Sequence, residues 1–272
     1  MLTPGVKEKV TVIIPFYRAN ISAYETIAIE QCFKVLATHP IIAIKPRSLA
    51  LPAEVQKYPF TKIVSFDEAF FKGIDGYNAL MLSAAFYKGF LDYEYMLIHQ
   101  LDAFVFSDQL KYWCSQSYDY IGAPWLKDCD HPDIFKAIKS TIQYYFHTRY
   151  NIQNNGQPTK YQYENRVGNG GFSLRRVNKF YEQCLQMKPE IDTYLATGHH
   201  RFNEDGFWSV EVNRKRKKLN IPGYKIGLKF SVEFAPERAL RLNDNELPFG
   251  CHAWDRYADF WRPYFKKCNY DI

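Results

Sequence analysis

The sequence of 272 residues predicts an α/β fold built on a doubly wound parallel sheet. Short β-rich apolar runs alternate with segments of helical periodicity between residues 10 and 106, which is the pattern of consecutive βαβ units. The first run is apolar at nearly every position, as expected of a strand that is buried on both faces. Hydrophobic residues make up 47% of the chain, which is enough for a large core.

Four strands and two helices are expected in the first half of the chain. The strands are predicted at residues 10–16, 41–44, 62–66 and 95–98. The first helix begins near Ser22, because Ser22 and Glu25 match the S-x-x-E pattern of a capping box. Apolar residues at positions 28, 32, 35 and 36 give this helix one buried stripe. The second helix is predicted over residues 75–90.

The second half is less regular. Residues 132–149 and 176–187 show helical patterns, and residues 225–234 are predicted as a strand. The polar segment 151–166 is long enough to be a functional loop. Residues 167–175 (VGNGGFSLR) are predicted as a tight turn, because glycine accepts positive φ and close backbone approach. No linker marks a boundary, so a single domain over residues 1–272 is expected.

Net charge and cysteine usage limit the classes of ligand and the cellular compartment that we expect for this protein. The net charge of +6 suits anionic ligands, a membrane surface or nucleic acid. The basic run Arg214–Lys218 (RKRKK) is by default a solvated face, and the sharper alternative is attraction to anionic lipid headgroups. The six cysteines form no C-x-x-C pair, which indicates reduced thiols. Without a signal-peptide apolar region or a membrane-spanning run, we expect a soluble cytoplasmic protein, at most peripheral to a membrane.

Asp102 is the first candidate functional residue. It directly follows the strand predicted at 95–98, where a carboxylate is costly to bury unless it is paired or ligated. Open α/β sheets bind ligands at the C-terminal edge of their strands, so Asp102 is predicted to contact a divalent cation or ribose hydroxyls. The alternative is a carboxylate that caps nearby backbone. Gln100 lies on the same face of the strand and is expected to contact the same ligand.

Glu204 and Asp205 are the second candidate. An aspartate here is either a helix N-cap or, in a cleft, a general base whose pKa is raised by burial and by its neighbour; the sequence leaves both open. His252, between apolar residues, is expected in the core, and the pair His199–His200 is expected on the surface. No nucleophile elbow, Walker motif or G-x-G-x-x-G motif indicates another chemistry.

Six short motifs follow one another between Val10 and Trp254. They are IIPFYR at 13–18, QLDAF at 100–104, YDYIGAPW at 118–125, VGNGGFSLRR at 167–176, NEDGFW at 203–208 and PFGCHAW at 248–254. The ordered set resembles a family of predicted bacterial glycosyltransferases with the GT-A fold, long described as a domain of unknown function. This resemblance implies one GT-A-like domain with a Rossmann-type mixed sheet flanked by helices. Its nucleotide-binding half would span about residues 8–110, and its donor-sugar and acceptor half about residues 111–265.

The resemblance also implies roles for individual residues. Asp205 would be the catalytic base, and Glu204 would orient the sugar or the acceptor. Contacts with the nucleotide or donor are implied for Pro15, Phe16, Tyr17, Arg18, Asn78, Gln100, Asp102, Gly170, Gly171 and Arg175. The segment 151–166 would fold over the bound donor and exclude water.

A divalent cation, Mn²⁺ or Mg²⁺, is a further implication. GT-A enzymes usually hold it with a D-x-D motif. Asp102 matches the first acid of that motif, whereas Phe104 occupies the place of the second. By the resemblance, Asp102 would either contact ribose or hold the metal with help from His252, because C-terminal histidines are metal ligands in some GT-A enzymes. In the absence of the metal, Arg175 or Arg176 would neutralise the leaving diphosphate.

The activity implied is an inverting hexosyl transfer in polysaccharide biosynthesis. The donor would be a nucleotide-sugar, most simply a UDP-hexose, and the acceptor a hydroxyl of a glycan or of a lipid-linked oligosaccharide. Three alternatives stay open: a nucleic-acid binder, which the positive charge and aromatic content allow; a non-catalytic sugar-binding module; and a glycoside hydrolase. A hydrolase needs two carboxylates across one cleft, which Asp102 with Glu204 or Asp205 would supply.

Overall fold

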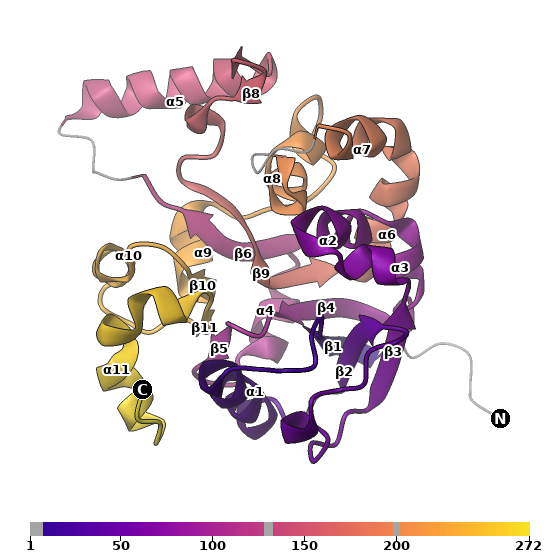
Figure 1. Ribbon diagram of the computed structural model, residues 1–272. Coiled ribbons are helices and arrows are strands. Elements are labelled where there is room, and N and C mark those ends of the chain that lie inside the picture. Colours follow the sequence, from indigo (N-terminus) through magenta and orange to yellow (C-terminus); the bar gives the residue numbers. More distant parts are fainter. Residues whose placement is uncertain (1–7, 128–132, 198–201) are drawn as a thin grey trace.

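A six-stranded mixed sheet forms the centre of the protein (Figure 1). The computed structural model describes residues 8–127, 133–197 and 202–272, so Cys129, His199 and His200 lie outside the described residues. The strand order is β3-β2-β1-β4-β9-β6. These strands are β1 (Glu8–Pro15), β2 (Ile41–Pro46), β3 (Lys62–Phe66), β4 (Tyr93–His99), β6 (Tyr120–Trp125) and β9 (Arg166–Arg176).

Four neighbouring strands of this sheet are parallel, and one is inverted. β1 pairs in parallel with β2 and β4, and β2 with β3. β9 is antiparallel to both β4 and β6. The α/β class and the mixed sheet are therefore confirmed, and the purely parallel sheet expected from the strand pattern is wrong at β9.

Helices cover both faces of the sheet (Figure 1). They are α1 (Ala23–Val35), α2 (Gly73–Met81), α3 (Ala84–Lys88), α4 (Leu110–Ser115), α5 (Ile134–Arg149), α6 (Val177–Gln186), α7 (Lys188–Leu195), α8 (Glu204–Ser209), α9 (Tyr224–Phe230), α10 (Pro236–Leu242) and α11 (Ala258–Lys267). Alternate residues of β1 serve two cores: Val12 and Ile14 belong to the core that includes α1 and α4, and Ile13 to the core that includes α3, α6 and α8. Burial on both faces explains the continuous apolar run of β1.

Short strands complete the fold beside the main sheet. β10 (Ser231–Val232), β11 (Gly250–Cys251) and β5 (Phe104–Val105) form a small sheet that carries a third, aromatic-rich core with α11. β7 (Gln153–Asn154) and β8 (Gln157–Pro158) form a separate hairpin. Among the described residues, no helix has the length and hydrophobicity needed to cross a lipid bilayer.

Most predicted elements are present, and three differ. The capping box at Ser22 is confirmed, with Ser22 and Glu25 exchanging both hydrogen bonds. The helix predicted over 75–90 is divided into α2 and α3, because Ser83 caps a new helix start. The strand predicted at 225–234 is wrong over α9. A Cβ on Gly227 would lie 2.6 Å from Val167, so this helix packs directly against the sheet.

The glycine-rich segment 167–175 is the third difference. It is not a turn, because it lies within the 11-residue strand β9. The positive-φ glycines of the described chain are Gly73 and Gly156, so the glycines of β9 serve close approach rather than unusual dihedrals. The register of β9 against β6 is irregular near Ala123, which is the deformation expected where a strand bends beside a site.

Candidate functional site

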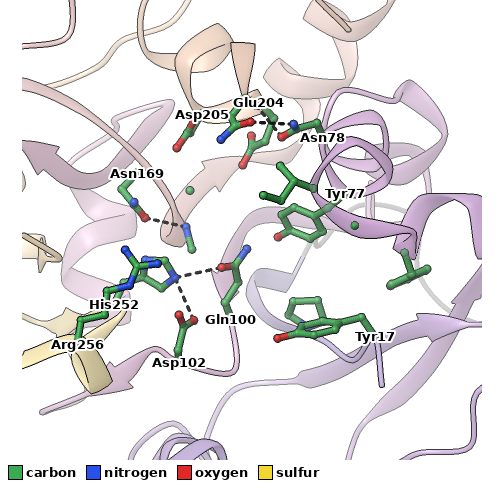
Figure 2. Close-up of a pocket in the computed structure, with 17 residues that line it drawn as sticks. Tyr17, Tyr77, Asn78, Gln100, Asp102, Asn169, Glu204, Asp205, His252 and Arg256 are labelled. Carbon is green, nitrogen blue, oxygen red and sulfur yellow. Dashed lines mark hydrogen bonds and ion pairs between the residues drawn. The ribbon is translucent and has the colours of Figure 1, made fainter. Parts of the chain in front are cut away.

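One cavity of about 500 Å³ lies at the C-terminal ends of β1 and β4 (Figure 2). Its walls come from these strand ends, from α2, β9 and α8, and from the segment after β11. The lining residues are Pro15, Tyr17, Phe71, Gly73, Ile74, Tyr77, Asn78, Gln100, Asp102, Asn169, Gly170, Gly171, Asn203, Glu204, Asp205, His252 and Arg256. This is the sheet edge at which open α/β folds bind ligands, so the place predicted for Asp102 is confirmed.

Three polar side chains converge on one side of the cavity. The Nε2 atom of His252 lies 3.0 Å from Oδ1 of Asp102 and 3.1 Å from Oε1 of Gln100 (Figure 2). Gln100 and Asp102 follow β4 directly, and His252 follows β11. The His252 side chain is 10% exposed and that of Asp102 is 38% exposed. His252 therefore belongs to the cavity wall, which corrects the expectation that it is only a core residue.

Carboxylates flank the His252 ring on both sides. Glu233 Oε1 lies 3.6 Å from Nδ1, opposite the side that faces Asp102. Burial alone lowers the pKa of His252, but the charges of Asp102 and Glu233 outweigh it and raise the pKa to about 10. Burial likewise opposes ionisation of Asp102, yet the neighbouring His252 brings the net pKa of Asp102 below its usual value. The cluster therefore favours an ionised carboxylate beside a positively charged ring.

Phe104 takes no part in this cluster. Its ring is fully buried and stacks on Phe265 with the ring centroids 3.9 Å apart. The side chain that shares the cavity with Asp102 is Gln100, two residues before it rather than two residues after it. Position 104 belongs to β5 and points into the C-terminal aromatic core, so it offers no second ligand beside Asp102, as the departure from D-x-D indicated.

Glu204 and Asp205 lie on the opposite side of the cavity, at the start of α8 (Figure 2). Oε1 of Glu204 accepts a hydrogen bond of 2.8 Å from Arg175, and Asn78 Oδ1 accepts one of 2.9 Å from the backbone N–H of Glu204. Asn78 also donates to Asn203 Oδ1 at 3.1 Å, which ties α2 to the start of α8. Glu204 is thus held by neighbours on α2 and β9, as a positioned charge.

Asp205 has an unusual electrostatic environment. Burial and the adjacent Glu204 raise the pKa of Asp205 to about 8. Its Oδ1 accepts a hydrogen bond of 2.7 Å from the backbone N–H of Gly206, which opposes the rise without cancelling it. A carboxyl group with a pKa near neutrality is suited to proton transfer. The residue of the pair with the raised pKa is thus Asp205.

Two glycines of β9 allow both sides of the site to approach the strand. A Cβ on Gly170 would lie 2.3 Å from Oε1 of Glu204, and a Cβ on Gly171 would lie 2.0 Å from Nε2 of His252. Neighbouring residues of a strand point to opposite faces, so β9 passes between the two groups. The glycines do line the cavity as expected, and their immediate reason is the space required by Glu204 and His252.

Three predicted contact residues do not line the cavity. Phe16 is fully buried in the core that includes α1, because it faces away from Pro15 and Tyr17 along the strand. Arg18 is held outside the cavity by Glu25 at 2.7 Å. Arg175 is fully buried and bonds Glu204 and the hydroxyl of Tyr87. The role of Arg175 as a phosphate-facing cation is therefore wrong, because its charge is paired with that of Glu204.

One further expectation needs correction. Arg176 ends β9 away from the cavity, where its guanidinium lies 3.3 Å from Asp119. The segment 151–166 does not line the cavity; it contains the β7–β8 hairpin and a turn that contacts α5, and its folding over a bound donor stays a prediction.

Sequence reasoning missed several lining residues. Arg256 is exposed and supplies a positive charge at the cavity. It lies four positions after His252, and this closeness in the sequence could have indicated that both residues line the same cavity. Tyr77 precedes Asn78 on α2, and Asn169 precedes the two glycines. Asn169 accepts a 3.0 Å hydrogen bond from the N–H of Gly171 and so fixes the strand beside His252. Within the described ranges, no group of three His, Cys, Asp or Glu side chains clusters as a metal site.

Comparisons with known proteins give a family and distant structural similarities. The chain is similar to the crystal structure of mouse xyloside xylosyltransferase 1, at 9% identity and a TM-score of 0.48, over 91% of this chain and 97% of that one. It is also similar to galactosyltransferase LgtC in complex with donor and acceptor sugar analogs, at 10% identity and a TM-score of 0.47, over 89% and 86%. No curated protein matches. A family model described as protein of unknown function (DUF5672) matches residues 60–252, and the chain therefore belongs to this family.

Proposed function

We propose that the protein is a glycosyltransferase that moves a sugar from a nucleotide-sugar, most simply a UDP-hexose, to a hydroxyl of a glycan or lipid-linked acceptor. One observation carries the proposal. The same cavity has the cluster of Gln100, Asp102 and His252 on one side, and on the other side the carboxyl of Asp205, whose pKa is raised to about 8. Transfer from a nucleotide-sugar needs both, one for the leaving diphosphate and one for the attacking hydroxyl.

The first cluster fits a divalent cation such as Mn²⁺ or Mg²⁺. Oδ1 of Asp102 lies 3.0 Å from Nε2 of His252, and Oε1 of Gln100 lies 3.1 Å from it. Carboxylate, amide carbonyl and imidazole groups are ligands that suit Mn²⁺. Glu233, 3.6 Å from Nδ1, lies on the side of the ring from which a carboxylate commonly orients a metal-binding histidine. The bound cation would displace the His252 proton and offset the charge of the departing diphosphate.

The remaining lining residues suit a nucleotide-sugar. Tyr17 and Tyr77 offer aromatic faces for a base or sugar ring. Arg256 adds a positive charge on the side of His252, where the diphosphate would bind. Oε2 of Glu204 is buried and has no hydrogen-bond partner among the described residues. A buried free acceptor is costly, so Glu204 is suited to accept a hydrogen bond from a donor-sugar hydroxyl.

Asp205 is the proposed base. It lies across the cavity from the cation cluster (Figure 2), so an acceptor hydroxyl beside it would attack the sugar from the side opposite the diphosphate. The ionised form of Asp205 takes the proton of that hydroxyl as the new glycosidic bond forms and the bond to the diphosphate breaks. One such displacement inverts the anomeric configuration.

The test is Asp205→Asn, with Asp259→Asn as the control because Asp259 is fully exposed on α11. Nucleotide-sugars are screened by thermal shift, and transfer is then measured with the donor that binds. We expect Asp205→Asn to keep the shift and to lose at least about a hundredfold in transfer rate, with the control unchanged. Full activity of Asp205→Asn, or a product of retained configuration, would remove Asp205 as the base. No shift with any nucleotide would overturn the proposal.

A further inference from the structure

Helix α5 stands apart from the rest of the molecule. It spans 16 residues, Ile134–Arg149, and none of them is buried. Figure 1 shows it beyond the β6 end of the sheet, with the β7–β8 hairpin at its C-terminal end. A helix in water normally buries one apolar stripe against its own core, so the exposed apolar side chains of α5 call for a partner outside the described chain.

The apolar side chains of α5 form one continuous face, which we call the α5 apolar face. Its residues are Ile134 (69% exposed), Phe135 (79%), Ile138 (51%), Ile142 (52%), Tyr145 (57%) and Phe146 (47%). Their spacing of three, four and seven residues places them on one side of the helix. Six neighbouring large apolar side chains form more than the scattered single residues that are normal on a protein surface.

The opposite face of α5 is fixed to the body of the protein. The ring of Tyr144 lies under the guanidinium of Arg166, 3.1 Å from the ring centroid. Nδ1 of His147 lies 2.7 Å from the hydroxyl of Thr159, and Arg214 donates to the backbone carbonyl of Thr148. These contacts fix the rotation of the helix about its axis, so the α5 apolar face points outward.

Positive charge borders this face. Lys136, Lys139 and Arg149 are the charged residues of α5. Asp133 at the N-cap lies 4.0 Å from Lys136, and no other Asp or Glu occurs from residue 133 to residue 152. Arg214, which contacts the C-terminal part of α5, begins the basic run, and its next three residues, Lys215, Arg216 and Lys217, are exposed. An exposed apolar stripe with a basic border has the charge and shape of a helix that lies in the surface of an anionic bilayer.

We propose that α5 docks the protein on anionic membranes, with the α5 apolar face in the headgroup region and the lysines and the basic run against lipid phosphates. A second copy of this chain fits less well, because pairing these faces brings two basic borders and two chains of net charge +6 together. Docking needs no nucleotide or sugar, so it stands or fails separately from the transferase activity.

The experiment is co-sedimentation with vesicles of phosphatidylcholine alone or with phosphatidylglycerol. The variants are Ile138→Ser with Ile142→Ser, and Lys136→Glu with Lys139→Glu. Ile63→Ser is the matched control, because Ile63 is an equally exposed isoleucine (50%) on β3. We expect the wild type and the control to bind the anionic vesicles, and each double variant to bind at least about tenfold more weakly. Circular dichroism and Tm should not change, because the substituted side chains are exposed.

Three results would overturn this proposal. They are equal binding of the isoleucine double variant and the wild type, equal binding to both kinds of vesicle, and a stable dimer that the same substitutions dissociate while no vesicle binding is seen. The last result would assign the α5 apolar face to a second copy of the chain.

Discussion

At the scale of single residues, Asp205 and Glu204 show how neighbouring acids acquire different properties. Arg175 reaches Glu204 at 2.8 Å and compensates its charge. Asp205, within the described part of the chain, accepts a hydrogen bond from the backbone N–H of Gly206, and its pKa is raised to about 8. Adjacent acids with separated protonation behaviour are typical of acid–base sites. The residue pattern predicted the pair, and the resemblance implied the division of roles. The contact of Arg175 with Glu204 was not predicted, because the two residues are 29 positions apart in the chain.

The raised pKa of Asp205 predicts a pH-dependent stability. In the unfolded chain an aspartate ionises near pH 4, so between about pH 4 and pH 8 the folded state holds a proton that the unfolded state lacks, and stability falls as pH rises. Asp205→Asn removes this loss. Relative to the wild type, its Tm should therefore rise by about 4 °C or more between pH 5 and pH 8. Parallel Tm curves of the two proteins would contradict the raised pKa; Asp259→Asn is the control.

At the scale of elements, β9 connects both halves of the site. Its glycines favoured a turn in the sequence because they resemble loop-forming residues. In the fold they form a strand, since β4 and β6 supply its hydrogen bonds on both sides. Local propensity was overridden by pairing with strands whose paired residues lie between 41 (Trp125 with Arg166) and 81 (Tyr95 with Arg176) positions earlier, which a short window of sequence does not contain. At α9, where a strand was predicted, the distant contact is of another kind: the helix packs against the sheet, with Gly227 against Val167 of β9.

Gly171→Ala tests the close approach at β9. The new methyl group would lie 2.0 Å from Nε2 of His252, so the ring must leave Gln100 and Asp102. We expect transfer to fall by at least about a hundredfold, with a stability loss of about 1–3 kcal/mol from overpacking. Gly223→Ala is the matched control, because a Cβ there has no neighbour within 4 Å. Unchanged activity of Gly171→Ala would show that His252 need not occupy its place beside Asp102.

At the scale of the whole molecule, the proposed cation site joins two distant parts of the chain. Gln100 and Asp102 follow β4, and His252 arrives 150 residues later through the small sheet of β5, β10 and β11. Antiparallel pairing of β11 with β5 places Cys251 opposite Phe104. This pairing brings His252 to the strand end where Asp102 lies. Cation binding should therefore stabilise the fold as a whole, because it clamps the C-terminal segment to the main sheet.

Thermal unfolding with UDP, with and without Mn²⁺, tests the cation site. A ligand that binds only the folded state raises Tm with concentration, so Mn²⁺ should add several degrees to the shift with UDP, and EDTA should remove the gain. His252→Ala should abolish the Mn²⁺ increment. His147→Ala, on α5, serves as the control. Equal shifts with and without Mn²⁺ in the wild type would exclude this cation role.

The sequence by itself determined the α/β class, the strands of the first half, the helix start at Ser22 and the prominence of Gln100, Asp102, Glu204 and Asp205. These features depend on local patterns, namely apolar runs, capping residues and acids at predicted strand or helix ends. Only the tertiary structure decided that β9 is an inverted strand, that Arg175 pairs with Glu204, that Glu233 flanks His252 and that α5 leaves an apolar face uncovered. Each of these depends on contacts between residues far apart in the chain, which neither periodicity nor composition records.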